Sequence, residues 1–210
     1  WNHPEKFGEI VVRPVDRREN YVKRCVALPG DTLSIVDGLV HIDGKPAEDI
    51  EGLQFNYLVE TKKVLEDKLL ESLNVRKADR LIFNSEPYGA RVLARLGYVD
   101  STGNMNYVYH LPLTQDSYNK LKTKSYVVSI KREPSMMSGK TFPLNREDDW
   151  TRDDYGPIWI PKAGATVTLT KENLPLYEQI IRNYERNQLE VKNDVIYING
   201  QAASTYTFKM

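Results

Sequence analysis

DTLSIVDGLVHIDGKPA, residues 31–47, is the stretch of the chain that decides its fold. Apolar and polar residues alternate on both sides of Asp37-Gly38, and Asp-Gly between two alternating runs is the strongest short-range signal of a β-hairpin. Near the other end of the chain, NQLEVKNDVIYINGQAA (187–203) repeats the pattern, and its apolar positions, central turn and final glycine all coincide with those of the first stretch. We therefore expect two related pieces of antiparallel β-scaffold that superpose, belong to the same β-region and flank an insertion.

The region between the two hairpins has a mixed pattern of strands and helices. Thr114 is suited to cap a helix, because its hydroxyl can accept a hydrogen bond from a free amide of the first turn. In chain order we expect a strand at 55–61, a helix at 62–73, two strands at 79–84 and 106–113, the capped helix at 115–123 and a last strand at 125–133. A short helical piece is expected at 90–97. This order is that of a ferredoxin-like βαββαβ unit.

The sequence thus predicts a mostly β fold with an α+β insertion. Residues 1–48 and 144–210 are expected to form the β-scaffold, and residues 49–143 the inserted ferredoxin-like unit. The second scaffold part should also hold a strand at 166–170 and a helix at 171–185. The apolar face of that helix is expected to pack into a core; it consists of Leu174, Tyr177, Ile180, Ile181 and Tyr184.

Composition narrows the possible classes of function. Among the 210 residues, Lys+Arg and Asp+Glu both total 29, so the net charge is zero, which argues against a nucleic-acid-binding surface and a polybasic membrane patch. No apolar run approaches the ~18 residues that a membrane span needs. The single cysteine and three scattered histidines provide no metal-binding cluster, so neither a metal nor an organic cofactor is expected.

The stretch NYVKRCVALPGD, residues 20–31, places Lys23 inside a run of apolar and β-branched residues. One interpretation is an edge strand whose lysine extends to water, and on spacing alone this is the commoner case. The other is a lysine that apolar neighbours keep neutral, so that it acts as a base. Alternation along a strand would place Lys23, Cys25 and Ala27 on one face and leave Arg24 on the other, where it makes a structural ion pair.

This stretch resembles the lysine segment of bacterial type I signal peptidases, which are membrane-bound serine endopeptidases. Their segment reads Tyr-(Ile/Val)-Lys-Arg-x-(Val/Ile)-(Gly/Ala)-Leu-Pro-Gly-Asp, followed by strands that end in (I/V)NGKP. The close match covers residues 4–47, and the second hairpin follows it more weakly. The matching residues of the segment are Tyr21, Val22, Lys23, Arg24, Val26, Leu28, Pro29, Gly30 and Asp31.

The resemblance implies a Ser/Lys dyad in which Lys23 is the general base toward a serine. It also implies that the lysine strand pairs with the extended end of a signal peptide, and that Tyr21 and Val22 line shallow pockets for small residues before the cleavage site. Plain core packing of Tyr21 and Val22 remains an open alternative. The implied substrates are exported preproteins, and the implied location is the extracytoplasmic side of a bacterial plasma membrane, with a transmembrane segment outside this chain.

Two family elements do not appear in the sequence. The nucleophile lies upstream of the lysine in a Ser-x-Met-x-Pro type of element, yet residues 1–22 contain no serine, and the downstream Gly-Asp-Asn element is also missing. We therefore expect an extracytoplasmic fragment that is inactive by itself. NREDDWTRDDYGPIWIP (145–161) echoes the downstream element but is interpreted as a structural turn, and Ser135-Met136-Met137 is interpreted as an exposed loop rather than a nucleophile motif.

A second class of function remains open on the sequence alone. A non-catalytic β-rich module could bind another protein through a strand edge and through the ferredoxin-like insertion. An apolar helix followed by a serine-methionine element upstream of Trp1 would favour the peptidase over this module.

Overall fold

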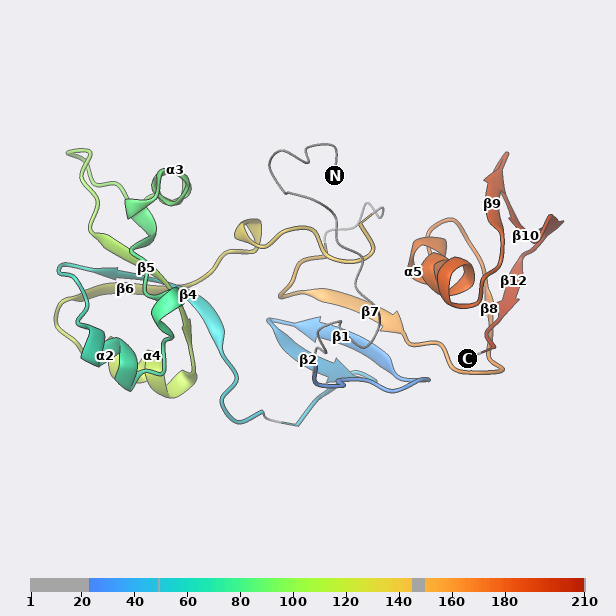
Figure 1. Ribbon diagram of the computed structural model, residues 1–210, viewed down its shortest axis with the longest axis horizontal. Coiled ribbons are helices and arrows are strands. Elements are labelled where there is room, and N and C mark those ends of the chain that lie inside the picture. The colour runs from blue at the N-terminus through green and yellow to red at the C-terminus, as the bar shows by residue number, and fades with distance from the viewer. Residues whose placement is uncertain (1–22, 49, 145–149, 210) are drawn as a thin grey trace, which may run out of the picture.

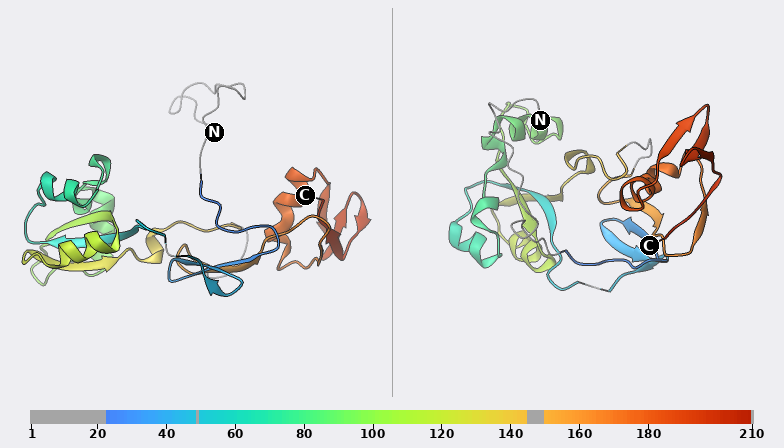
Figure 2. Two further views of the ribbon diagram at one scale, coloured as in Figure 1. Left: turned by 90° about the horizontal axis from the view of Figure 1, so that it is seen from below. Right: turned by 45° about the vertical axis from the view of Figure 1, so that its right-hand side comes forward.

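The computed structural model describes residues 23–48, 50–144 and 150–209 of the chain. Within these ranges the protein consists mostly of antiparallel β-sheet with few helices, as the sequence predicts. Three β-regions follow one another along the long axis, with the insertion on one side of a central sheet and the C-terminal region on the other (Figures 1 and 2).

The central sheet holds the first predicted hairpin. Strands β1 (Thr32–Val36), β2 (Leu39–Ile42) and β3 (Lys45–Pro46) form an antiparallel meander, and β7 (Tyr155–Trp159) pairs with the other edge of β1. Asp37 and Gly38 between β1 and β2 have φ of 48° and 75°. Positive φ at both central residues is what a type I′ turn requires, and this turn matches the twist of the two strands. The hairpin is therefore confirmed, with Ile35 opposite Val40.

The second hairpin repeats the first in detail. It consists of β9 (Leu189–Lys192), β10 (Val195–Ile198) and β11 (Gln201–Ala202), again joined by two-residue turns with positive φ. Equivalent bonds recur: the carboxylate of Asp43 accepts from the amide of Thr32 at 2.9 Å, and the side-chain oxygen of Asn199 accepts from the amide of Gln188 at 2.9 Å. The expected similarity of the two hairpins is thus confirmed.

The expectation that the two hairpins share one β-region is wrong. β1 and β2 belong to the sheet of order β3-β2-β1-β7, whereas β9 and β10 belong to a separate sheet of order β11-β10-β9. The two hairpins lie in separate sheets because they pack against different neighbours. β1 accepts β7 as a further neighbour, while Leu189 and Ile196 of the second hairpin face a different hydrophobic core.

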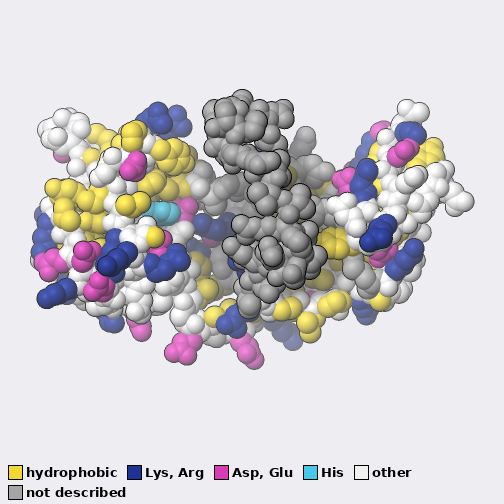
Figure 3. Space-filling model, in the orientation of Figure 1, with side chains coloured by type: hydrophobic (Ala, Val, Ile, Leu, Met, Phe, Trp, Pro, Cys, Tyr) yellow, Lys and Arg dark blue, Asp and Glu magenta, His cyan; other side chains and the backbone are white. Residues whose placement is uncertain are grey.

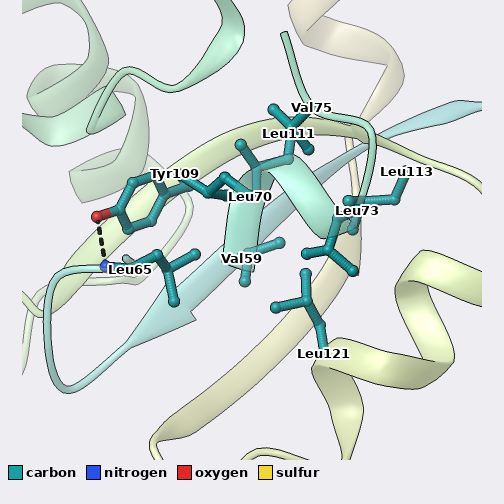
Figure 4. Packing of buried hydrophobic residues seen from close by; sticks show 9 residues of the cluster. All are labelled: Val59, Leu65, Leu70, Leu73, Val75, Tyr109, Leu111, Leu113 and Leu121. Carbon is teal, nitrogen blue, oxygen red and sulfur yellow. Dashed lines mark hydrogen bonds between the residues drawn. The ribbon is translucent and has the colours of Figure 1, made fainter. Parts of the chain in front are cut away.

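The insertion is built on a three-stranded antiparallel sheet of order β5-β4-β6. The central strand β4 (Phe55–Thr61) and its neighbour β5 (Tyr107–Leu113) match the predicted strands, and β6 (Val127–Arg132) lies within the predicted range 125–133. The core on one face of this sheet contains Leu70 of helix α2 (Asp67–Ser72), Leu73 directly after it and Leu121 of helix α4 (Gln115–Lys122). Figure 4 shows this core, where the Tyr109 hydroxyl accepts a hydrogen bond of 2.9 Å from the amide of Leu65.

A third helix packs on the opposite face of the sheet. α3 (Pro87–Arg95) covers residues 90–95 of the short helical piece predicted at 90–97 and begins with a proline, which needs no amide partner in the first turn. Leu58 and Val108 of the sheet pack with Leu93 of this helix. Val59 of β4 and Tyr109 of β5 belong to the core on the other face, so both strands are covered on two faces.

Two predicted elements of the insertion differ from the structure. Residues 79–84 do not form a strand; they contain the ends of two 3₁₀ turns, η2 (Lys77–Asp79) and η3 (Phe83–Ser85), and only a single bridge joins Ile82 to Tyr109. The guanidinium of Arg80 donates to the carbonyl of Val75, which folds the segment back on itself. The helix predicted at 62–73 is confined to α2. The full ferredoxin-like unit and the boundaries 49–143 remain predictions.

The C-terminal region combines a two-stranded sheet, β8 (Thr166–Thr168) with β12 (Thr205–Thr207), and helix α5 (Leu174–Gln179). The helix continues as a π-helical turn, η5 (Ile180–Tyr184). Leu174, Tyr177 and Ile181 are buried as predicted, but Tyr184 is 70% exposed. A π turn bonds residue i to i+5, so it breaks the 3.6-residue period on which the position of Tyr184 was predicted.

Candidate functional site

Lys23 lies exposed at the start of a segment that has no strand pairing as far as Leu28. The expected strand is therefore wrong for residues 23–28. Both edges of β1 are already occupied, by β2 and by β7, so this sheet offers the segment no edge beside β1. The expected apolar surroundings of Lys23 are absent among the described residues, since Val26 is 44% and Leu28 is 64% exposed. The two predicted substrate-binding residues, Tyr21 and Val22, lie outside the described residues.

The chain turns sharply directly after this segment. The amide of Asp31 donates to the carbonyl of Leu28 at 3.0 Å, with Pro29 and Gly30 at the two central positions and φ of 105° at Gly30. A proline followed by a residue with positive φ is the pattern of a type II turn. The carboxylate of Asp31 also accepts from the amide of Leu28 at 2.7 Å. The Pro-Gly-Asp sequence therefore closes the lysine segment with a locally stabilised turn.

This turn is also fixed to β7. The amide of Gly30 donates to the carbonyl of Ile160 at 2.8 Å, and the amide of Ile160 donates to the carbonyl of Asp31 at 2.8 Å. The indole N–H of Trp159 donates to the carbonyl of Gly30 at 3.1 Å. Three hydrogen bonds from residues far apart in the sequence thus determine where the lysine segment meets the sheet. The sequence analysis did not identify Trp159.

The other end of β1 contacts the insertion. Nη1 of Arg132, at the end of β6, donates to the carbonyl and carboxylate of Asp37 at 2.9 and 3.0 Å. Its guanidinium lies over the ring of Phe55, 3.9 Å from the centroid, and Nη2 is 3.5 Å from the carboxylate of Asp153. The amide of Gly38 donates to the carbonyl of Asp153 at 2.6 Å. The turn of the first hairpin is therefore attached to both the insertion and the approach to β7.

A buried carboxylate continues this network. Glu133 is 6% exposed, and its Oε2 lies 3.1 Å from Nε2 of His110 and 3.1 Å from Nη1 of Arg152. Burial raises the pKa of the Glu133 carboxyl, but hydrogen bonds with Asn56, His110 and Arg152 together outweigh this effect and hold the pKa below its ordinary value. Arg152 pairs in turn with Asp153, at 3.3 Å. We call the set Asp37, Arg132, Glu133, Arg152 and Asp153 the charged joint.

The sequence pattern gave no signal for the charged joint, because its members come from three separate segments. The histidine involved, His110, was expected to be structural, and its contact with Glu133 places it beside the joint. No group of three or more side chains suited to bind a metal ion occurs in the described ranges. Lys23 thus lies on an exposed segment, and hydrogen bonds attach the turn that follows this segment to the end of β7.

The two motif-like stretches have structural roles. Ser135-Met136-Met137 forms a 3₁₀ turn, η4, in which Met136 is 66% exposed while Met137 packs against the insertion core. In the echo of the downstream element, the Thr151 hydroxyl accepts from the amides of Asp153 and Asp154, and the amide of Thr151 donates to the carbonyl of Asp154. This part of the echo is the expected turn; residues 145–149 lie outside the described ranges.

The surface seen in Figure 3 carries no large area of one charge, and basic and acidic side chains are interspersed on it. Hydrophobic side chains gather on the lobe of the insertion, where Leu81 and Tyr88 are 64% and 60% exposed. No helix among the residues that the structure describes is long and apolar enough to cross a membrane.

Comparison with known proteins gives one matching family, whose range contains Lys23, and one matching relative. The family described as "Signal peptidase, peptidase S26" matches residues 1–88, which extends beyond the 4–47 of the motif resemblance. "Probable signal peptidase I-1" of Synechocystis sp. is 32% identical over an alignment of 66 residues, and the match covers 26% of this chain and 34% of that relative. The resemblance to type I signal peptidases is confirmed. The match thus spans about a third of that signal peptidase, and no solved structure matches the chain.

Proposed function

We propose that this chain is the lysine-bearing part of a type I signal peptidase, which removes signal peptides from exported preproteins with a Ser/Lys dyad. The observation that carries the proposal is the family match over residues 1–88, because this range contains Lys23 and the complete Pro-Gly-Asp turn. The hydrogen bonds that fix this turn to β7 support it, since a catalytic base needs a defined position.

In the proposed reaction Lys23 acts as general base and then as general acid. Its neutral amine removes the proton from a serine hydroxyl as the oxygen attacks the scissile carbonyl, and the resulting ammonium returns that proton to the leaving amine. Water then hydrolyses the acyl-serine, with the same amine as base. Since residues 1–22 hold no serine, we propose that the serine comes from an upstream segment outside this chain, so that the chain alone is inactive.

The exposure of Lys23 also has a place in this proposal. A lysine serves as a base only in its neutral form, and apolar cover favours that form. Because the described residues leave Lys23 exposed, the cover would come from the serine segment, the substrate, and residues such as Tyr21 and Val22. We assign Tyr21 and Val22 to the shallow pockets for small substrate residues, and the active protein to the extracytoplasmic side of a bacterial plasma membrane.

The test is preprotein cleavage by the signal peptidase that contains this chain. Lys23→Ala should reduce cleavage by ~10²–10⁴-fold or more, because removing a general base typically costs that much. Lys23→Arg should fail equally, since a guanidinium does not lose its proton near neutral pH. Lys45→Ala is the matched control, because Lys45 is an exposed lysine on β3, and it should cleave normally. Near-normal cleavage by either Lys23 variant would refute the proposal.

A further inference from the structure

Trp159 is the last residue of β7 and lies at the boundary between two regions of the protein. Its Cα pairs with that of Thr32 in the central sheet, one residue after the Pro-Gly-Asp turn. Its indole N–H donates to the carbonyl of Gly30 at 3.1 Å, which places the ring beside the turn that follows the Lys23 segment. The side chain is half-buried. Because the indole is rigid, packing that fixes the ring of Trp159 also fixes the direction of its N–H.

The ring of Trp159 is packed against the C-terminal core. Its centroid lies 6.2 Å from that of Phe208, which is 1% exposed and contacts the rings of Tyr177 and Tyr206. Trp159 is partly buried against this core, which α5, the second hairpin and β12 build together. The orientation of the indole is therefore set by a core that lies outside the central sheet.

The backbone beside Trp159 strengthens the same connection. Ile160 exchanges hydrogen bonds with Gly30 and Asp31, each 2.8 Å long. These bonds fix the distance between the strands, while the indole N–H satisfies the carbonyl in the middle of the turn. A Cβ at Gly30 would lie 3.4 Å from Cδ of Lys162, so this side of the turn is also in close contact with the chain after β7.

We propose that Trp159 is a positioning residue for Lys23: it orients the Pro-Gly-Asp turn, and through the turn the direction in which residues 23–28 leave the sheet. The proposal deepens the assigned function and rests on it, because the position of Lys23 matters only if Lys23 is the base. Trp159 itself contacts neither substrate nor the reacting atoms in this scheme. It connects the C-terminal core to the lysine segment.

The first experiment uses amide hydrogen exchange and ¹H–¹⁵N NMR on the 210-residue chain. Trp159→Phe keeps an aromatic ring against Phe208 but removes the N–H that donates to Gly30. The exchange rate of the Gly30 amide should rise ~10-fold or more, because its bond to the carbonyl of Ile160, which holds the turn against the chain after β7, opens more often. The signals of residues 23–28 should also shift. Trp150→Phe is the matched control, since the ring of Trp150 packs at a tilt against that of Tyr155, and it should leave these signals unchanged.

The second experiment measures preprotein cleavage by the signal peptidase that contains this chain. Trp159→Phe should lower kcat ~10-fold or more and leave KM nearly unchanged, because a misplaced base weakens the transition state rather than substrate binding. Unchanged Gly30 exchange, or faster exchange with normal kcat, would each overturn the positioning role. Failure of the assigned function is recognised separately, by normal cleavage in Lys23→Ala.

Discussion

Gly38 shows how one residue of a hairpin turn connects two parts of the chain. With φ of 75° it occupies the left-handed region that glycine adopts without strain. A Cβ at this position would lie 2.0 Å from Nη2 of Arg132 and 2.9 Å from Cε1 of Phe55. Arg132 has little freedom to move away, because Asp37 and Asp153 hold its guanidinium in the charged joint. Glycine at this position therefore allows both the left-handed backbone conformation and the close approach of Arg132 and Phe55 from the insertion.

Gly38→Ala and Gly44→Ala form a matched pair. Both glycines have φ of 75° in two-residue turns, so alanine should cost each about 1–2 kcal/mol of backbone strain. Gly44 has no atom within 4 Å of its added Cβ, whereas Gly38→Ala must also displace Arg132, which should add about 1–3 kcal/mol. Urea unfolding measures the difference. Equal losses in the two variants would mean that the contact between Gly38 and Arg132 contributes nothing.

At the scale of elements, the two hairpins were predictable because their signals are local. Alternation sets the faces of each strand, and a two-residue turn with positive φ sets the register, so the repeat could be identified before any tertiary contact was known. The capping of α4 is equally local: the Thr114 hydroxyl accepts a hydrogen bond of 3.2 Å from the amide of Ser117. The residues within such elements are therefore enough to predict most of their structure.

The segments at 79–84 and 23–28 show where this local information ends. Both are apolar enough for strands, but contacts elsewhere decide whether they pair: β2 and β7 occupy both edges of β1, and the bonds from Arg80 to the carbonyl of Val75 fold 79–84 back on itself. Ile82 makes a single bridge to β5, and residues 23–28 make no strand pairing. For the same reason the sequence indicated Lys23 as a candidate base but not Trp159 or the charged joint. Those residues are brought together only when β7 pairs with β1 after the insertion.

At the scale of the whole molecule, the charged joint connects the insertion to the central sheet of β3, β2, β1 and β7. Arg132 ends β6 and Glu133 follows it directly, while Arg152 and Asp153 precede β7, so the joint spans the return of the chain from the insertion. Glu133 is its most buried member, and removing one partner of a buried charged pair leaves the other unsatisfied. The stability of this connection should therefore depend on the charge of Glu133.

Glu133→Gln should lower the free energy of unfolding at pH 7 by about 1–3 kcal/mol, the cost of a lost charge-assisted hydrogen bond. The folded-state pKa of Glu133 lies below its unfolded value of about 4.3. Its stabilisation is thus complete above the unfolded pKa and disappears as the pH falls through the folded pKa. Urea titrations at several pH values should show the difference from the unmodified chain shrinking in that acidic range.

Glu66→Gln is the control for this experiment. Glu66 is 75% exposed and pairs with Lys63 at 3.6 Å, so its exposed ion pair should contribute little. A Glu133→Gln variant as stable as Glu66→Gln at pH 7, or a stability difference that grows as the pH falls, would contradict the role given to the joint.

The measurement that tests the account most directly is chemical rescue of Lys23 in the signal peptidase to which we propose this chain belongs. Cys25 is the only cysteine here, so a Lys23→Cys variant in a Cys25→Ala background carries one thiol in this chain. Preprotein cleavage should fall by ~10²–10⁴-fold or more. Aminoethylation of the new thiol restores an amine at nearly the length of lysine and should restore most of the activity. Normal cleavage before alkylation, or no recovery after mass spectrometry confirms the modification, would contradict the assignment of Lys23 as the base.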